Sequence, residues 1–234
     1  IISNFKDIRS VFYKAYKEQL YIGHNPFTVF EVGTMKARKR RLSSTELKRL
    51  KEFHLEPNSS LWHARNYFLF SFYCAGIRVS DLIRLKWGDI KEGRVTYGMS
   101  KNESEHSIKL TTQALEILAH YEQENRQPTD YVFPILHEGF DHLDKFKKNK
   151  ILDSKKEIIR NNLKKIQNKA GIETSFSMHV SRHSYANLLR ENKVDTHQIK
   201  DLLNHSSIAV TEAYLAQFNR TTADEVHEDI LSSI

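Results

Sequence analysis

Hydrophobic residues recur every three or four positions along most of the chain, which is the spacing of amphipathic helices. Over residues 3–21, for example, Phe5, Ile8, Phe12 and Tyr16 fall on one face of such a helix. The same spacing predicts further helices over residues 43–53, 61–74, 80–86, 112–123, 140–149, 154–170, 179–191, 195–203 and 207–217, and an acidic stretch at 221–234 is compatible with one more.

One segment, residues 89–110, has the period of strands instead of helices. Val95, Tyr97, Ile108 and Leu110 alternate with polar residues. Glycine and asparagine between these runs supply turn signals, so the segment is expected to form a small antiparallel meander. The chain is therefore predicted to be mainly α-helical with a small antiparallel β-sheet, an α+β fold.

Two serines are expected to mark helix starts. Ser43 and Glu46 stand three residues apart, the spacing of a capping box in which each side chain bonds to the other residue's backbone N–H. Ser80 is expected to cap a short helix that ends near Lys86.

Composition narrows the class of protein. The chain has 234 residues, of which 39% are hydrophobic, enough for a sizeable core. Its one cysteine, Cys74, excludes an internal disulfide and a cysteine-based zinc cluster, and suits a reducing compartment. The longest apolar run, residues 67–77, is too short to span a bilayer. With no secretory signal pattern at its start, the chain is expected to be cytoplasmic.

The positive charge is concentrated at the N-terminal end. The net charge is +7, and residues 1–50 alone hold 11 Lys and Arg against 4 Asp and Glu. The densest part is a basic run formed by Lys36, Arg38, Lys39, Arg40 and Arg41. Such a run attracts the DNA backbone by displacing counterions. A solvated linker with no ligand is the alternative interpretation.

The motifs of several common site classes are absent from the sequence. No Walker A or GxGxxG pattern occurs, so phosphate-loop ATP binding and dinucleotide binding are not indicated. His179 and His183 have the i, i+4 spacing of zinc ligands, but Val180 replaces the glutamate of HExxH and Arg182 would place a cation beside the metal. An arginine and a histidine on one helical turn suit a phosphate better than a metal.

Three short segments carry the candidate chemistry. The first holds Arg78, two residues after the break at Gly76, and the second holds His179 and Arg182. The third holds His205, followed nine residues later by Tyr214. Taken singly, a surface arginine, a capping histidine and a core tyrosine are the more ordinary interpretations.

Together and in this order, the three segments resemble the tyrosine recombinase (phage integrase) family. Residues 76–82, with Leu85, Trp87, Asp89 and Ile90, match the family's box Gly-Ile-Arg-x-Ser-Glu/Asp-Leu-x-x-Leu-x-Trp-x-Asp-Ile. Residues 179–186 match His-x-x-Arg-His-Ser/Thr-Tyr/Phe-Ala. Residues 203–214 match Leu-Gly-His-Ser-Ser-Ile-x-x-Thr-x-x-Tyr, except that Asn204 replaces the glycine and so makes the backbone geometry there uncertain. The residues that fill these boxes are similar to those of mobile-element integrases of the Bacteroides type.

The resemblance implies an enzyme that breaks and rejoins DNA by transesterification. Tyr214 would attack a backbone phosphate and leave a 3′-phosphotyrosyl bond and a free 5′-hydroxyl. Arg78 and Arg182 would each clamp the non-bridging oxygens through two donors, stabilising the charge of the transition state. A phenol, with a pKa of about 10, needs a nearby base or cationic field to react. No metal, ATP or other cofactor is implied.

The remaining roles are assigned from the same resemblance. Lys101 is expected to protonate the leaving 5′-oxygen, and Lys109 in the same predicted sheet is the alternative. His179 would be a donor or proton shuttle near Tyr214, and His205 a further donor to the phosphate. Two supporting residues complete the set: Asp81 is expected to orient the site, and His183 to hold the fold rather than the phosphate.

The resemblance also implies partners and a domain order. The family works on double-stranded attachment sites as a homotetramer, with the segment after the tyrosine docked on a neighbouring protomer, sometimes with accessory DNA-bending proteins, in the bacterial cytoplasm at the nucleoid. Residues 1–35 would be the C-terminal remnant of a core DNA-binding domain and the start of a linker, 36–43 a basic linker, and 44–234 the catalytic domain with its tail. Two rival functions stay open: relaxation of DNA by a type IB topoisomerase, and a non-catalytic DNA-binding module.

Overall fold

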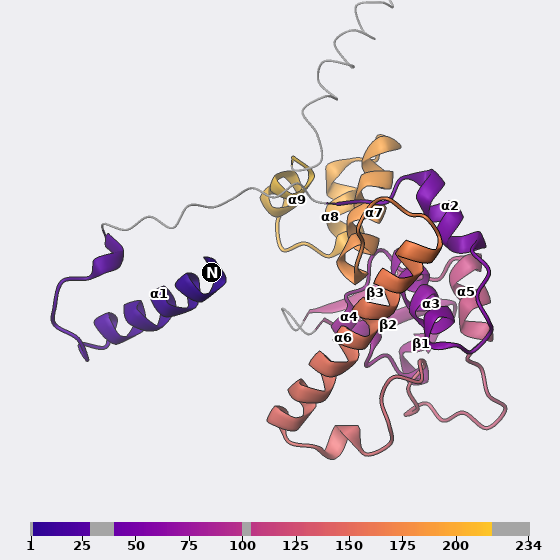
Figure 1. The fold of residues 1–234 in the computed structure, drawn as a ribbon, viewed down its shortest axis with the longest axis horizontal. Coiled ribbons are helices and arrows are strands. Elements are labelled where there is room, and N and C mark those ends of the chain that lie inside the picture. The colour runs from indigo at the N-terminus through magenta and orange to yellow at the C-terminus, as the bar shows by residue number, and fades with distance from the viewer. Residues whose placement is uncertain (1, 29–39, 100–103, 217–234) are drawn as a thin grey trace, which may run out of the picture. The chain divides into compact units, whose positions relative to one another are not determined.

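The structure, a computed structural model, describes residues 2–28, 40–99 and 104–216 (Figure 1). The chain divides into two compact units, residues 1–38 and residues 39–234. Among the described residues, the helices all lack the length and apolar content needed to cross a membrane.

The first unit is a helix followed by a short turn. Helix α1 (Ile2–Lys17) is shorter than the predicted range 3–21, because the chain turns at Gln19, whose φ is +57°. The 3-10 helix η1 (Pro26–Thr28) follows, and Asn25 Oδ1 starts its turn by accepting the N–H of Phe27 at 2.9 Å. The ring of Phe12 lies 5.6 Å from that of Phe27.

The second unit is mainly helical and holds one small sheet, as the sequence predicted. Its helices are α2 (Ser44–Glu52), α3 (Ser60–Tyr73), α4 (Val79–Leu82), α5 (Thr112–Ala119), α6 (Lys145–Lys169), α7 (Met178–Glu191), α8 (Thr196–Leu203) and α9 (Ile208–Leu215), with 3-10 helices η2 (Trp87–Asp89) and η3 (Phe140–His142). Its strands are β1 (Ile90–Lys91), β2 (Arg94–Gly98) and β3 (Glu105–Lys109).

Helix α3 is the centre of the main hydrophobic core. Its apolar residues face several directions, so it is buried almost all round, and it packs against α5, α6 and α7. Phe68 and Phe70 have no exposed surface. Since α7 carries Arg182, this packing ties one predicted site helix directly to the core.

The sheet is antiparallel in the order β1–β2–β3. Val95 pairs with Ile108 and Tyr97 with His106, and these four side chains form the buried face. The predicted meander over residues 89–110 is therefore confirmed. The last described pair before the β2–β3 turn is closed by the N–H of Met99, which donates to the Ser104 carbonyl at 2.9 Å.

Helices α7, α8 and α9 pack together and carry a second, smaller core (Figure 1). Its buried residues are Ala186, Ile199 and Leu203, and Tyr214 packs against them. The predicted nucleophile is thus held by apolar contacts on the two helices that precede it.

The capping box at Ser43 is confirmed. The Ser43 hydroxyl accepts the N–H of Glu46 at 3.2 Å, and the Glu46 carboxylate accepts the N–H of Ser43 at 2.9 Å. Directly before it, the N–H of Leu42 donates to the buried Ser184 hydroxyl at 2.9 Å, which anchors the start of the second unit on α7.

Four further predicted helices differ from the structure. Ser80 does not cap α4: the helix starts after Arg78, whose carbonyl accepts the N–H groups of Asp81 and Leu82, so Ser80 lies inside it. Residues 140–149 and 154–170 do not form two helices. Asp144 caps a single helix, α6, which contains no proline or glycine to break it, and residues 140–142 form only η3. Helix α5 ends at Ala119, short of the predicted residue 123.

Candidate active site

Arg182 joins two of the predicted site segments. It lies in the second turn of α7 and is only 7% exposed. Its Nη1 donates to the Gly76 carbonyl at 3.2 Å, and its Nη2 donates to the Leu203 carbonyl. Two of its nitrogens therefore already serve backbone carbonyls, and a phosphate would be bound through its remaining N–H groups.

Gly76 allows this close approach. Its φ is +73°, in the left-handed region, and a Cβ atom built there would lie 2.6 Å from Cα of Arg182. No side chain fits at this place without displacing the arginine, so close packing explains why a glycine stands at this position of the first box.

Arg78 supplies a second cation beside the first. It precedes α4, it is half-buried, and its Nη1 is buried with no hydrogen-bond partner among the described residues. Burial lowers the pKa of Arg182, and the neighbouring charge of Arg78 lowers it further. Two guanidinium groups in electrostatic contact, one with an unused buried donor, form a site that an anion would complete.

Tyr214 lies half-buried on α9 beside two imidazoles. Its hydroxyl shares a hydrogen bond with Nδ1 of His183, and its ring centroid lies 5.3 Å from that of His205. Burial raises the pKa of the Tyr214 phenol, and the positive charge of Arg182 opposes this shift. The phenol is thus protonated at neutral pH and needs a base to react.

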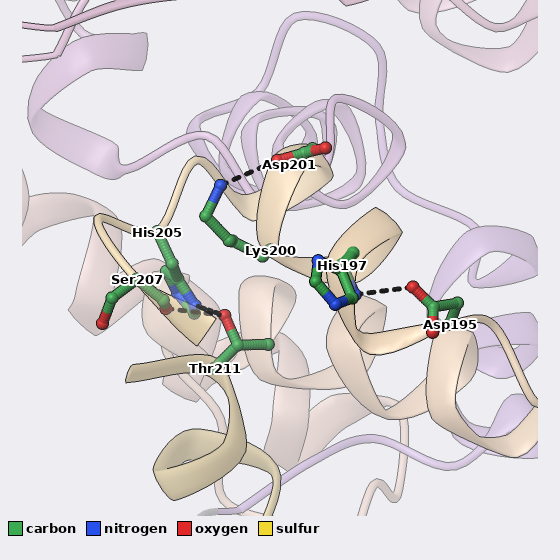
Figure 2. Close-up of polar contacts among 7 residues, drawn as sticks. All are labelled: Asp195, His197, Lys200, Asp201, His205, Ser207 and Thr211. Atoms are coloured by element: carbon green, nitrogen blue, oxygen red, sulfur yellow. Dashed lines mark hydrogen bonds and ion pairs between the residues drawn. The ribbon is translucent and has the colours of Figure 1, made fainter. Parts of the chain in front are cut away.

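His205 is held by a threonine to which the sequence had assigned no role. His205 Nδ1 lies 2.9 Å from Oγ1 of the fully buried Thr211 (Figure 2). That hydroxyl in turn donates to the Ser207 carbonyl at 3.4 Å, so its oxygen accepts the Nδ1–H of His205. The motif spacing contained the signal, because Thr211 stands between the histidine and the tyrosine of the third box.

A buried polar layer supports the two arginines. Asp81 is only 5% exposed, and its negative charge opposes the lowering of the Arg182 pKa. On the sheet, the Tyr97 hydroxyl lies 3.2 Å from Nδ1 of His106. Burial and then the charge of Arg182 lower the pKa of His106, which keeps this imidazole neutral beside the cations.

His179 and His183 occupy different positions on α7. His179 lies in the first turn and is exposed, whereas His183 is half-buried and contacts Tyr214. Their rings stack, with centroids 6.2 Å apart and an interplanar angle of 20°. The hydrogen bond described for Tyr214, the predicted nucleophile, is therefore made by the histidine for which only a supporting role was expected. Among the described residues, no group of three His, Cys, Asp or Glu side chains is arranged to hold a metal.

The structure brings together Arg78, Asp81, Arg182, His183, His205 and Tyr214, with His179 at the edge of this group. Lys101 lies outside the described residues, as do Lys36, Arg38 and Lys39. Arg40 is exposed, and Arg41 is half-buried at the start of the second unit. Lys109 pairs with Arg94 at the end of the β2–β3 hairpin opposite the turn.

Comparison with known proteins gives one family match and several relatives. The family model described as "Phage integrase family" matches residues 40–220. The tyrosine recombinase XerA of Pyrococcus furiosus is 30% identical over 160 residues, which are 68% of this chain and 50% of XerA. The tyrosine recombinase XerD of Listeria innocua is 31% identical over 150 residues, 61% of this chain and 46% of XerD. The chain thus spans about half the length of the curated relatives it matches.

Solved structures share the fold at low sequence identity. A lambda integrase (75–356) dimer bound to a COC′ core site has a TM-score of 0.63 at 20% identity, and the match covers 94% of this chain and 75% of that one. The XerA recombinase crystal structure has a TM-score of 0.57 at 22% identity and coverages of 82% and 65%. A lambda integrase tetramer bound to a Holliday junction has a TM-score of 0.60 at 19% identity and coverages of 91% and 59%.

Proposed function

The chain belongs to the phage integrase family, and from this premise we propose that it is a site-specific tyrosine recombinase that cleaves and rejoins DNA through a 3′-phosphotyrosyl intermediate. The observation that carries the proposal is the position of Tyr214, hydrogen-bonded to His183 and within electrostatic reach of the buried Arg182. A phenol, a base and an arginine pair are the parts that attack on a phosphodiester requires.

In the proposed reaction, the Tyr214 oxygen attacks the phosphorus and the bond from phosphorus to the 5′-oxygen breaks. The phenolic proton passes to an imidazole, and the electron pair of the broken bond goes to the 5′-oxygen, which takes a proton. Arg78 and Arg182 neutralise the non-bridging oxygens, and His205, oriented by Thr211, donates to the same phosphate. His179 serves as a donor or proton shuttle, and Asp81 orients the arginines.

Lys101 is proposed as the acid that protonates the 5′-oxygen. The alternative, Lys109, stands four residues beyond Glu105 on β3, about 13 Å along an extended strand. Glu105 marks the end of β3 that is near His205, because its carbonyl oxygen lies 3.2 Å from Nδ2 of Asn204. Lys109 stands at the other end of the strand, and this distance favours Lys101, which the sequence places between Met99 and Ser104.

The proposed substrate is double-stranded DNA carrying an attachment site, bound by a homotetramer with accessory DNA-bending proteins. A lambda integrase tetramer on a Holliday junction, similar in fold, supports this assembly. The acidic segment after Arg220 would dock on a neighbouring protomer, since its charge disfavours contact with DNA. The residues that fill the three boxes support a mobile-element integrase of the Bacteroides type. Such an enzyme would act at the nucleoid in the bacterial cytoplasm.

Residues 1–35 are proposed as the remnant of a core DNA-binding domain, joined by the basic linker 36–43 to the catalytic domain 44–234. Lys36, Arg38, Lys39, Arg40 and Arg41 would bind the DNA backbone. Replacing all five with glutamine should then weaken binding to every sequence and reduce the magnitude of the slope of log affinity against log salt by as much as about 4.5. An unchanged slope would mean that the run is only a linker.

A trapped covalent intermediate tests the activity. A library of duplexes with randomised sequence is nicked just beyond the central positions, so that cleavage releases a short fragment and strands the enzyme on the DNA. The chain is incubated with the library in EDTA, and protein-linked DNA is recovered under denaturing conditions and sequenced. We expect enrichment of one sequence family with the wild-type chain and none with Tyr214→Phe, which should still bind the enriched duplex.

Three other results would contradict the proposal. An adduct that survives Tyr214→Phe would refute the assignment of the nucleophile. Binding without any adduct would favour the non-catalytic module. Supercoil relaxation by monomers that join no two duplexes would favour a type IB topoisomerase.

A further inference from the structure

Asn204 stands where the third box of the family has glycine, and the structure shows how its backbone fits. It follows α8 with φ +46° and ψ +56°, in the left-handed region. The N–H of Asn204 donates to the Asp201 carbonyl and the N–H of His205 to the Lys200 carbonyl, both at 3.0 Å. This is the Schellman pattern of a helix end, at which asparagine is the commonest substitute for glycine.

The Asn204 side chain makes contacts that a glycine could not make. Its Nδ2 lies 3.3 Å from Sδ of Met99, 3.3 Å from Oγ of Ser104 and 3.2 Å from the carbonyl oxygen of Glu105. The amide nitrogen faces this cluster because the Glu105 carbonyl can only accept a hydrogen bond. Met99 and Ser104 close the last described pair of the β2–β3 hairpin, so one side chain holds both strands at the turn.

The other side of Asn204 adjoins the phosphate-binding groups. The Leu203 carbonyl directly before it accepts from Arg182, and His205 directly after it lies beside Tyr214. Asn204 is therefore a direct link between the hairpin and the residues that would bind the scissile phosphate.

We propose that Asn204 is a positioning residue for protonation of the leaving group, because its amide fixes the β2–β3 hairpin relative to Arg182 and His205. The inference rests on the proposed function. In the step concerned, the bond from phosphorus to the 5′-oxygen breaks with its electron pair on that oxygen, and the ammonium group of Lys101 gives up a proton to it and becomes an amine. Lys101 itself lies outside the described residues, and its sequence position between Met99 and Ser104 links it to the clamp.

A change of leaving group isolates this step. The duplex selected above is made in two forms, one with the natural 5′-oxygen at the scissile phosphate and one with a 5′-bridging sulfur. A thiolate leaves without prior protonation, since a thiol has a pKa of about 8.5, so the sulfur form does not need the acid. The rate of adduct formation is measured on both forms under single-turnover conditions.

With Asn204→Gly, adduct formation on the oxygen form should slow by about tenfold or more, while the rate on the sulfur form stays within about twofold of wild type. Lys101→Ala should show the same selective loss, and because it removes the proposed acid it gives the largest loss to be expected on the oxygen form. Equal rates for Asn204→Gly and wild type on the oxygen form would overturn the inference. A loss of equal size on both forms, for Asn204→Gly or for Lys101→Ala, would also overturn it.

Matched variants separate this effect from a general loss of structure. Asn58 also has a left-handed backbone, with φ +61°, but lies outside the site, so Asn58→Gly controls for the substitution itself and should match wild type on both forms. If Asn204→Gly does not fold, Ser104→Ala removes one contact of the clamp from the hairpin side and should show a smaller loss on the oxygen form only. Wild-type adduct formation in the same series tests the proposed function independently. A wild-type chain that forms no adduct would contradict the proposed function, whereas a wild-type adduct with no selective loss in Asn204→Gly would contradict only the inference about Asn204.

Discussion

The Tyr214 hydroxyl and Nδ1 of His183 share a hydrogen bond between α9 and α7. Burial raises the pKa of the phenol, so at neutral pH the hydroxyl keeps its proton and can donate it to Nδ1 in the tautomer that leaves this nitrogen unprotonated. The ring of His179 stacks on His183 from the preceding turn of α7. A nucleophile bonded to a base that a third group orients is the arrangement that activates weak nucleophiles. His183 is thus better placed than His179 to accept the proton.

Replacing His183 should change how cleavage depends on pH. His183→Gln keeps a polar side chain but removes the base, so adduct formation near pH 7 should fall by about 10²-fold. Because hydroxide would then have to remove the phenolic proton, the rate should go on rising with pH where the wild-type rate has levelled off. Single-turnover rates on the oxygen duplex between pH 6.5 and 9 measure both effects.

His179→Gln is the matched comparison from the same helix. It should lower the rate without changing the shape of the pH profile, because the bond between His183 and Tyr214 stays in place. If instead His179→Gln produces the rising profile and His183→Gln does not, the base is His179 and the contact seen here is only structural.

The two arginines should differ in their effect on stability. Arg182→Ala leaves the Gly76 and Leu203 carbonyls without their donor in a buried site, and should lower the free energy of unfolding by about 2–4 kcal/mol. Arg78→Ala removes a like charge and a buried unused donor, so the free energy of unfolding should stay within about 0.5 kcal/mol of wild type or rise. Urea unfolding at pH 7 measures both.

Cleavage should show no such difference, since either substitution removes charge from the proposed phosphate site. Both variants should form the adduct at least about 10²-fold more slowly. A large loss of stability in Arg78→Ala would contradict the view that this arginine is held for the substrate rather than for the fold.

Much of this arrangement could be predicted from the sequence, because local signals and box spacing agree. The Ser43 capping box, the apolar helix α3 and the alternation of Val95 and Tyr97 each report a local preference that the fold keeps. One feature of the fold had no positive local signal. The absence of a break between residues 149 and 154 shows only as a lack of proline and glycine, and α6 runs through.

The roles of individual site residues depend on packing that a single sequence does not reveal. His179 and His183 lie one turn apart on α7, and only the position of α9 decides which of them meets Tyr214. Asn204 similarly departs from a family glycine, and its three contacts come from a hairpin about 100 residues earlier in the chain. Such contacts join distant segments, so residue type and spacing cannot predict them.

Gly76→Ala should disrupt the candidate site by displacing Arg182. The new Cβ would lie 2.6 Å from the Arg182 backbone, and the alanine would also have to adopt a φ of +73°. We therefore expect a loss of about 2–4 kcal/mol in the free energy of unfolding and a large drop in adduct formation. Gly93→Ala is the control, because Gly93 has a φ of +68° but nothing within 4 Å of the added atom. It should cost only the backbone strain, about 1 kcal/mol, and leave cleavage unchanged. Equal losses in both variants would mean that steric contact with Arg182 is unimportant.

Acid should weaken the fold through one buried and one half-buried neutral histidine. Burial lowers the pKa of His106, the charges of Arg182 and Arg78 lower it further, and burial alone lowers that of His63. Because these pKa values lie below the ordinary 6.5, the stability that the neutral rings contribute is complete above about pH 6.5 and is lost as the pH falls through the folded-state values.

His106→Gln separates the ring beside the active site from the other. Glutamine can still bond to the Tyr97 hydroxyl but does not titrate, so the free energy of unfolding should fall less steeply between pH 6.5 and 5 than in wild type, by up to about 1.4 kcal/mol per pH unit. Urea unfolding at half-unit pH steps gives both slopes, and parallel curves would show that His106 does not couple protonation to folding. If the slopes differ, protonation of His106 places a third positive charge beside Arg78 and Arg182. Since an anion offsets that repulsion, the bound DNA phosphate should then reduce the acid sensitivity of the wild-type chain more than that of the variant.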